Sequence, residues 1–257
     1  MRFTLPPSPA DPDSWAFVTV FKAASTYVTS VLAALFGGRR VPWVDLATYA
    51  FAHNLDEDTF CIENEALLRT PGYFFGAFRD AYIGQMPSLA AARVIAHVRD
   101  PRDCLVSNHY SLAFSHPLPT EAGPIRDKLL ADRNIYSSRT VDESVLADCE
   151  SFSRVFEELN GLNGRIPALY LSKYEDMVAD FDGWLDRLCN FTRCGHLTDI
   201  KSQIRAGANF NVEENKFNHM RQVSPGDFRR KLSPETQHIL TERLAPVLQS
   251  LGYSCKL

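Results

Sequence analysis

A lysine and two hydroxyl side chains follow the first apolar run of the chain. The stretch FVTVFKAASTYVTSVL (17–32) places Lys22, Ser25 and Thr26 between a β-branched segment and a helical pattern. The first N–H groups of a helix lack intrahelical partners and carry partial positive charge, so they attract anions. With the lysine and hydroxyls they would form a phosphate or sulfate site. The Gly-x-x-x-x-Gly-Lys-[Ser/Thr] phosphate loop is absent, and a capped helix with a surface lysine is the alternative.

An arginine follows a second apolar run. Arg99 comes directly after ARVIAHV (92–98), Pro101 can start the next helix, and Ser107 follows within that helix. A guanidinium forms paired, charge-assisted hydrogen bonds with phosphate, so Arg99 is a candidate phosphate ligand. The alternative is an ordinary helix start with an Arg99–Asp103 ion pair.

Two further segments contain candidates for a nucleotide site. Tyr174 in LYLSKYEDMVAD (169–180) could stack on a base, with the two acidic residues after it capping or bracing the basic loops. The segment MRQVSPGDFRRKLSPE (220–235) forms a basic turn in an otherwise acidic chain. Such a turn indicates a local anion site, and a solvated loop is the alternative.

Near-continuous apolar runs alternate with helical patterns along the chain. Strands are expected at 16–21, 72–78, 92–98 and 167–171, and helices at 25–36, within 141–161 and at 234–251. This pattern predicts a parallel sheet covered on both faces, with ligands at the carboxyl ends of its strands. We therefore expect an α/β fold: a single domain with a central parallel β-sheet flanked by helices and a P-loop-like phosphate-binding strand–loop–helix.

Composition limits the class of protein. The chain has 257 residues, 45% of them hydrophobic, which suits one domain at 15–257 after a loose lead-in at 1–14. The net charge of −4 argues against a nucleic-acid partner.

We see no signal-peptide core and no run of about 18 apolar residues, so we expect no membrane partner and a cytoplasmic location. The six cysteines include no Cys-x-x-Cys pair, which indicates reduced thiols and no zinc site. Residues 115–140 are expected to form a long excursion, and a lid over a substrate site is one role for such a segment.

In their order along the chain, the four segments resemble the sulfotransferases that use 3′-phosphoadenosine 5′-phosphosulfate (PAPS). The family segment Pro-Lys-Ser-Gly-Thr-Thr-Trp is similar to residues 21–27, with the lysine and both hydroxyls kept. Arg-Asn-Pro-Arg-Asp followed by a serine is similar to 99–103 with Ser107, and Tyr-Glu-Asp-Leu/Met to 174–177. Arg-Lys-Gly-x-x-Gly-Asp-Trp-Lys is similar to 221–229, where Gln and Val replace the Lys and the first Gly.

The resemblance covers residues 16 to 231 and implies a site and a reaction. Lys22 would donate to the bridging oxygen as sulfuryl transfers from PAPS to a hydroxyl or amine of a small-molecule metabolite, and 3′-phosphoadenosine 5′-phosphate (PAP) would leave without any metal. The implied donor-binding residues are Lys22, Ala24, Ser25, Thr26, Tyr27, Arg99, Ser107, Tyr174, Phe210, Arg221, Gln222 and Val223. The sequence leaves open whether the protein is a monomer or a homodimer.

The acceptor must lose a proton, so a general base is expected. Many relatives use a histidine in a Lys-Thr-His-Leu-Pro segment that this chain lacks, and Asp80 stands at the corresponding position. An aspartate there could instead cap a helix. The other candidates are His53, His116, Glu63 and Glu65, whereas His97 is expected in the core. Two alternative functions are a kinase or nucleotide hydrolase with a degenerate P-loop, and a non-catalytic nucleotide-binding relative.

Overall fold

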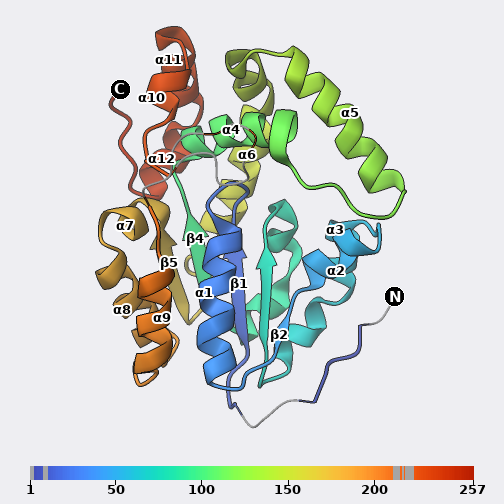
Figure 1. Ribbon diagram of the computed structural model, residues 1–257, viewed down its shortest axis with the longest axis vertical. Coiled ribbons are helices and arrows are strands. Elements are labelled where there is room, and N and C mark those ends of the chain that lie inside the picture. The colour runs from blue at the N-terminus through green and yellow to red at the C-terminus, as the bar shows by residue number, and fades with distance from the viewer. Residues whose placement is uncertain (1–2, 8–10, 211–214, 216, 218–222) are drawn as a thin grey trace.

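One parallel sheet forms the centre of the fold (Figure 1). Its strands within the described residues lie in the order β2–β3–β1–β4–β5. The protein is represented by a computed structural model that describes residues 3–7, 11–210, 215, 217 and 223–257. The strands are β1 (Trp15–Thr19), β2 (Trp43–Val44), β3 (Phe74–Phe78), β4 (Arg93–Val98) and β5 (Leu169–Lys173). Between β3 and β4 the chain crosses from one side of β1 to the other, and ligands of such sheets bind at this switch point.

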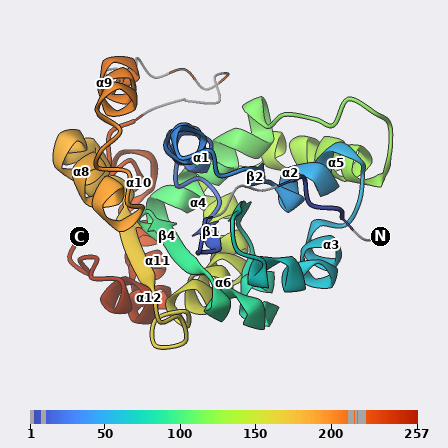
Figure 2. The same cartoon turned by 90° about the horizontal axis from the view of Figure 1, so that it is seen from below.

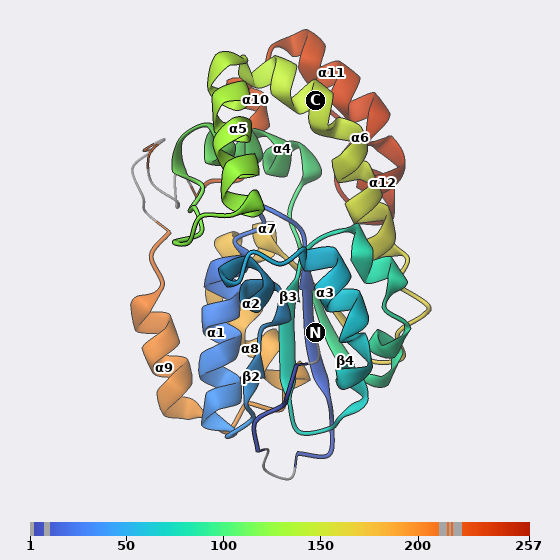
Figure 3. The same ribbon diagram turned by 90° about the vertical axis from the view of Figure 1, so that its right-hand side faces the viewer.

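Helices cover both faces of the sheet, as Figures 2 and 3 show. The α-helices are α1 (Ser25–Gly38), α2 (Leu46–Ala52), α3 (Glu57–Glu63), α4 (Pro101–Tyr110), α5 (Pro124–Ser138), α6 (Val141–Asn160), α7 (Tyr174–Ala179), α8 (Phe181–Phe191), α9 (Thr198–Gly207), α10 (Phe228–Lys231), α11 (Pro234–Arg243) and α12 (Ala245–Ser250). Short 3₁₀ helices are η1 (Glu65–Arg69), η2 (Ala81–Gln85) and η3 (Pro87–Ala91), and η4 (Ser111–Ser115) is a π-helical turn. Within the described part of the chain, no helix has the length and apolar character needed to cross a bilayer.

The alternation of side chains along β1 divides the core into two layers. Trp15 and Phe17 pack with the apolar side chains of α1 and α8, whereas Ala16 and Val18 pack with those of α6 and α12 on the other face. Successive residues of a strand point to opposite faces, and each face here is fully buried. The central strand is therefore held from both sides, which fixes the position of the loop that follows it.

The expected fold class is confirmed. The four predicted strands lie within two residues of β1, β3, β4 and β5. Strands β1, β3 and β4 are buried, near-continuous apolar runs, whereas β5 is mostly half-buried. Strand β2 was missed, since two residues are too short to produce a pattern. The loose lead-in at 1–14 and the domain at 15–257 stay a prediction, although Phe3 donates its N–H to Asn64 at 3.0 Å and Asp11 pairs with Arg39.

Two helical segments differ from expectation. The single helix predicted at 234–251 is interrupted at Leu244, because Pro246 lacks the N–H that a continuous helix would use. The predicted excursion at 115–140 contains the 15-residue helix α5, which Figure 1 shows at the same end of the molecule as α4. None of the residues of α5 is buried, which explains why their periodicity was weak.

His97 is a core histidine, as expected. Its side chain is fully buried in β4, where Nδ1 lies 2.8 Å from the Ser172 hydroxyl oxygen. The Trp184 indole donates to the same oxygen at 2.7 Å. Burial lowers the pKa of His97 to about 3, so the ring stays neutral in the folded protein at neutral pH.

Acid should destabilise the fold through His97. The unfolded histidine titrates near pH 6.5, above its pKa of about 3 in the fold, so the unfolded chain binds more protons between these values. The contribution of His97 to the free energy of unfolding is therefore complete above about pH 6.5 and is lost as pH decreases. The loss between pH 7 and pH 5 is about 2 kcal/mol. Denaturant unfolding at both pH values measures this loss.

The matched variants are His97→Gln and His196→Gln, the latter at an exposed position. The pH-dependent loss should shrink by about 2 kcal/mol in His97→Gln and stay unchanged in His196→Gln. An equal loss in both variants would contradict the assignment of the acid sensitivity to His97.

Candidate active site

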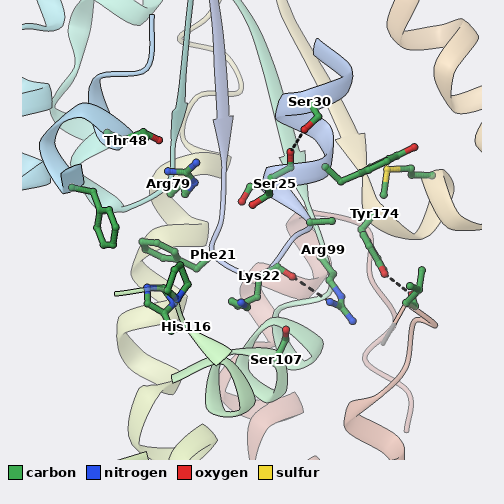
Figure 4. Close-up of a pocket in the computed structure, with 18 of the residues that line it drawn as sticks. Phe21, Lys22, Ser25, Ser30, Thr48, Arg79, Arg99, Ser107, His116 and Tyr174 are labelled. Carbon is green, nitrogen blue, oxygen red and sulfur yellow. Dashed lines mark hydrogen bonds between the residues drawn. The ribbon is translucent and has the colours of Figure 1, made fainter. Parts of the chain in front are cut away.

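A cavity of about 670 Å³ lies at the carboxyl ends of the strands (Figure 4). The loops after β1, β4 and β5 line it together with parts of α2 and the segment after α9. The predicted donor-binding residues that line it are Lys22, Ala24, Ser25, Thr26, Tyr27, Arg99, Ser107, Tyr174, Phe210 and Val223. Arg221 and Gln222 lie outside the described residues. The fold thus brings segments that are distant in sequence to one cavity.

The loop between β1 and α1 turns sharply at two residues. Lys22 has a φ of 68° and Ala24 a φ of 59°, both in the left-handed region that glycine prefers. Helix α1 starts directly after Ala24, and no described side chain forms a capping hydrogen bond at its N-terminus. The first N–H groups of this 14-residue helix therefore keep their capacity to bind an anion beside Ser25 and Thr26. Each left-handed residue costs on the order of 1 kcal/mol.

Arg99 connects the β4 loop to the β1 loop. Its Nη1 donates to the Lys22 carbonyl at 3.2 Å, and its guanidinium lies over the Tyr174 ring at 4.4 Å from the centroid. Nε is buried and has no hydrogen-bond partner among the described residues. Burial disfavours the charged guanidinium, but Asp103 and neighbouring groups outweigh it and raise the pKa of Arg99 above its ordinary value. Arg99 is therefore a fixed cation with an unsatisfied donor.

The end of β5 braces the other loops. The Tyr174 hydroxyl donates to the Val223 carbonyl. Glu175 accepts the N–H of Asp100 at 2.9 Å and the hydroxyl of Tyr253 at 2.9 Å. The bracing role predicted for Glu175 is confirmed, because its carboxylate joins the start of α4 to the C-terminal segment.

Asp103 is the buried carboxylate that joins Arg99 to the C-terminal segment. Its Oδ2 lies 3.6 Å from Nη2 of Arg99 and accepts the N–H of Gly226 at 2.7 Å. Its Oδ1 accepts the N–H of Phe228 at 3.0 Å. Burial raises the pKa of Asp103, while Arg99 and the two N–H groups act in the opposite direction. One side chain thus positions both the arginine and residues 226–228.

Aromatic side chains form another part of the cavity wall. The ring centroids of Tyr27 and Phe210 lie 6.2 Å apart in an edge-to-face arrangement. The ring centroids of Phe210 and Phe181 lie 5.2 Å apart. Together with Tyr174 they provide the kind of surface on which a purine base can stack.

The side of the cavity beyond Lys22 contains both apolar and titratable residues. Figure 4 shows Phe21, Arg79 and His116 on one side of Lys22, with Arg99 and Tyr174 on the other. The apolar lining residues of the cavity include Phe21, Ala47, Phe51 and Pro117, and its other titratable lining residues are Glu57, Arg79 and His116.

Glu57 carries no distinguishing signal in the sequence, because it is one of several acidic residues between positions 45 and 65. It starts α3 and accepts the hydroxyl of Tyr82 at 3.1 Å. Burial raises the pKa of Glu57, and Arg79 opposes this shift.

The candidate bases occupy different environments. Asp80 accepts the N–H of Ala81 at 2.6 Å at the start of η2 and is not among the residues that line the cavity. His53 is exposed and stacks on Tyr49. Glu65 accepts the N–H of Ser88 at 2.7 Å. Glu63, His53 and Glu65 do not line the cavity either, whereas His116 does.

Among the described residues, no group of three or more histidine, cysteine, aspartate or glutamate side chains is placed to hold a metal ion.

Replacing Asp103 with asparagine should loosen the C-terminal segment. The amide cannot balance the charge of Arg99 and accept both N–H groups, so we expect a loss of about 3–5 kcal/mol in unfolding free energy. Hydrogen exchange at the amides of Gly226 and Phe228 should accelerate beyond the average of the chain. Asp199→Asn, at an exposed position, is the control. Unchanged exchange at both amides in Asp103→Asn would contradict this role.

Comparison with solved structures identifies similar folds. A mouse sulfotransferase, SULT7A1, complexed with PAP matches with a TM-score of 0.54 and 15% identity over 92% of this chain and 84% of that one. Retinol dehydratase in complex with androsterone and inactive cofactor PAP matches with a TM-score of 0.51 and 16% identity, over 94% of this chain and 82% of that one. The sulfotransferase domain from the curacin biosynthetic pathway matches with a TM-score of 0.50 and 12% identity, over 95% of this chain and 99% of that one.

The sequence itself gives the family. No curated protein sequence matches the chain. The family model described as the sulfotransferase domain matches residues 86–250, which is more than half of the chain. This match includes the β4 loop with Arg99 and the β5 loop with Tyr174, and the expected resemblance is therefore confirmed. The chain belongs to the sulfotransferase family.

Proposed function

We propose that the protein transfers the sulfuryl group of PAPS to a hydroxyl or amine of a small-molecule acceptor. The observation that carries this proposal is the convergence of Lys22, Ser25, Thr26, Arg99 and Ser107 on one cavity. The family membership and the PAP complexes of structurally similar proteins support it. The cytoplasmic location and the oligomeric state stay predictions.

The residues of the cavity fit a donor with two separate phosphate groups. The uncapped N-terminus of α1, with Ser25 and Thr26, suits the 5′-phosphate. Arg99, with its buried and unpartnered Nε, and Ser107 on α4 suit the 3′-phosphate. Tyr27, Phe210 and Tyr174 provide aromatic faces on which the base can stack. When bound, PAPS supplies an activated sulfuryl group.

Lys22 stabilises the charge that develops during transfer. Sulfuryl transfer, like phosphoryl transfer, depends mainly on positioning and on neutralising charge at the leaving oxygen. The ammonium of Lys22 donates to that oxygen, while the N-terminus of α1 holds the adjacent phosphate. The left-handed conformation of Lys22 sets where its side chain leaves the loop, between the two sides of the cavity (Figure 4).

We assign the general base to His116 in place of Asp80. His116 lines the cavity next to Phe21 and Lys22 in Figure 4, whereas the Asp80 carboxylate caps η2. Nδ1 of His116 lies 3.3 Å from the Ser111 hydroxyl oxygen, which orients the ring. The imidazole then takes the acceptor proton as the acceptor oxygen or nitrogen attacks sulfur.

Incubation with PAPS and a panel of phenols, alcohols and amines should yield PAP and a sulfated product, both measured by mass spectrometry. Lys22→Met should lower the rate about 10²- to 10³-fold, because the leaving oxygen loses its cation. His116→Ala should lower it about 10²- to 10⁴-fold, because the acceptor proton has no base, with PAP affinity unchanged.

Matched controls separate these effects from general damage. Lys128→Met and His53→Ala change the same residue types at exposed positions outside the cavity and should retain full activity. PAP that binds without any turnover on the panel would favour a non-catalytic relative. Magnesium-dependent hydrolysis of ATP would instead support the nucleotide hydrolase.

A further inference from the structure

A second cavity of about 290 Å³ adjoins the first. The two share Thr26, Ser30, Thr48 and Arg79 as lining residues, of which Figure 4 labels the last three. The smaller cavity is lined in addition by Thr29, Ala33, Trp43 and Asp45. Four of the eight residues that line the smaller cavity carry hydroxyl side chains.

Trp43 gives this cavity an accessible aromatic surface. Its side chain on β2 is 45% exposed, while its indole N–H donates to the Gly76 carbonyl at 2.5 Å and anchors the ring. The other two tryptophans, Trp15 and Trp184, are buried. A large aromatic residue that is anchored by its edge and open to solvent is a common feature of ligand sites.

Arg79 stands in the wall between the cavities. Its side chain is half-buried, yet it forms no hydrogen bond or ion pair with any residue in the described parts of the chain. Asp45, beside it, accepts both the N–H and the hydroxyl of Thr48, at 2.9 and 2.7 Å. Burial raises the pKa of Asp45, and Arg79 opposes this shift.

The charges around Arg79 exclude a simple ionic ligand. An anionic group at Arg79 would meet the nearby carboxylates of Asp45 and Glu57, and a cationic group at these carboxylates would meet Arg79. Hydroxyl groups can both donate to a carboxylate and accept from a guanidinium, so a neutral polyol satisfies all of these partners. The C–H face of a sugar ring would also cover the apolar face of Trp43.

We propose that the smaller cavity binds a sugar-like, polyhydroxylated part of the acceptor, whose apolar part lies in the larger cavity. This assignment rests on the proposed function, since the larger cavity is taken as the place of transfer. The substrate class is therefore a glycosylated or similarly hydroxyl-rich small molecule.

Salicin, a phenyl glucoside, and its aglycone salicyl alcohol test this proposal as a matched pair. Each is titrated by calorimetry into the protein saturated with PAP. Salicin should bind at least about tenfold more tightly, as expected for one or two added hydrogen bonds. It should also change the tryptophan fluorescence, because Trp43 is the one tryptophan with an exposed side chain.

Two variants test whether the tighter binding of salicin depends on the smaller cavity. Trp43→Ala removes the aromatic surface, and Asp45→Asn keeps the cap of α2 while removing the carboxylate. Each should reduce the advantage of salicin over its aglycone to about twofold or less, with PAP affinity unchanged. Ile135→Ala, which alters an exposed apolar side chain of α5, should keep the full advantage.

The outcomes separate the proposed function from the assignment of the smaller cavity to a sugar. If PAP does not bind, the proposed function fails and this inference fails with it. If PAP binds but salicin and salicyl alcohol bind equally, or both variants keep the preference for salicin, the sugar-binding assignment alone is overturned.

Discussion

The buried contact between Arg99 and Asp103 is the interaction on which the site depends. Asp103 lies 3.6 Å from the guanidinium and accepts two N–H groups of the C-terminal segment, while Arg99 donates to the carbonyl of Lys22. Three loops at the end of the sheet are thereby connected through two side chains. A buried charge without a partner is strongly unfavourable, so neither residue can move independently of the other. Nε of Arg99 is buried and has no hydrogen-bond partner among the described residues.

The loop before α1 turns through two left-handed residues, Lys22 and Ala24, without a glycine. Ala24 occupies the place of the glycine in the related motif and still takes a φ of 59°. The buried strand β1 on one side and the packed helix α1 on the other impose this conformation. Alanine in place of glycine therefore adds backbone strain to this loop, on the order of 1 kcal/mol.

The sequence was informative where packing and chemistry follow local patterns. Buried runs such as 92–98 predicted the strands, and the order of Lys22, Arg99 and Tyr174 predicted residues that the fold brings to one cavity. The acceptor side could not be predicted in the same way. Glu57, Thr48 and Trp43 lie on α3, α2 and β2, which come together only in the tertiary structure. Asp80 was chosen by its correspondence to a histidine in a family segment, but its carboxylate caps η2.

The most direct test of the account is the nucleotide preference of the cavity. Calorimetric titration of the protein with PAP, AMP and ATP–magnesium compares ligands that differ in the 3′-phosphate. We expect tight binding of PAP alone and its loss in Arg99→Ala, because Arg99 is the buried cation assigned to that phosphate. Equal or tighter binding of ATP–magnesium, unaffected by the substitution, would contradict it.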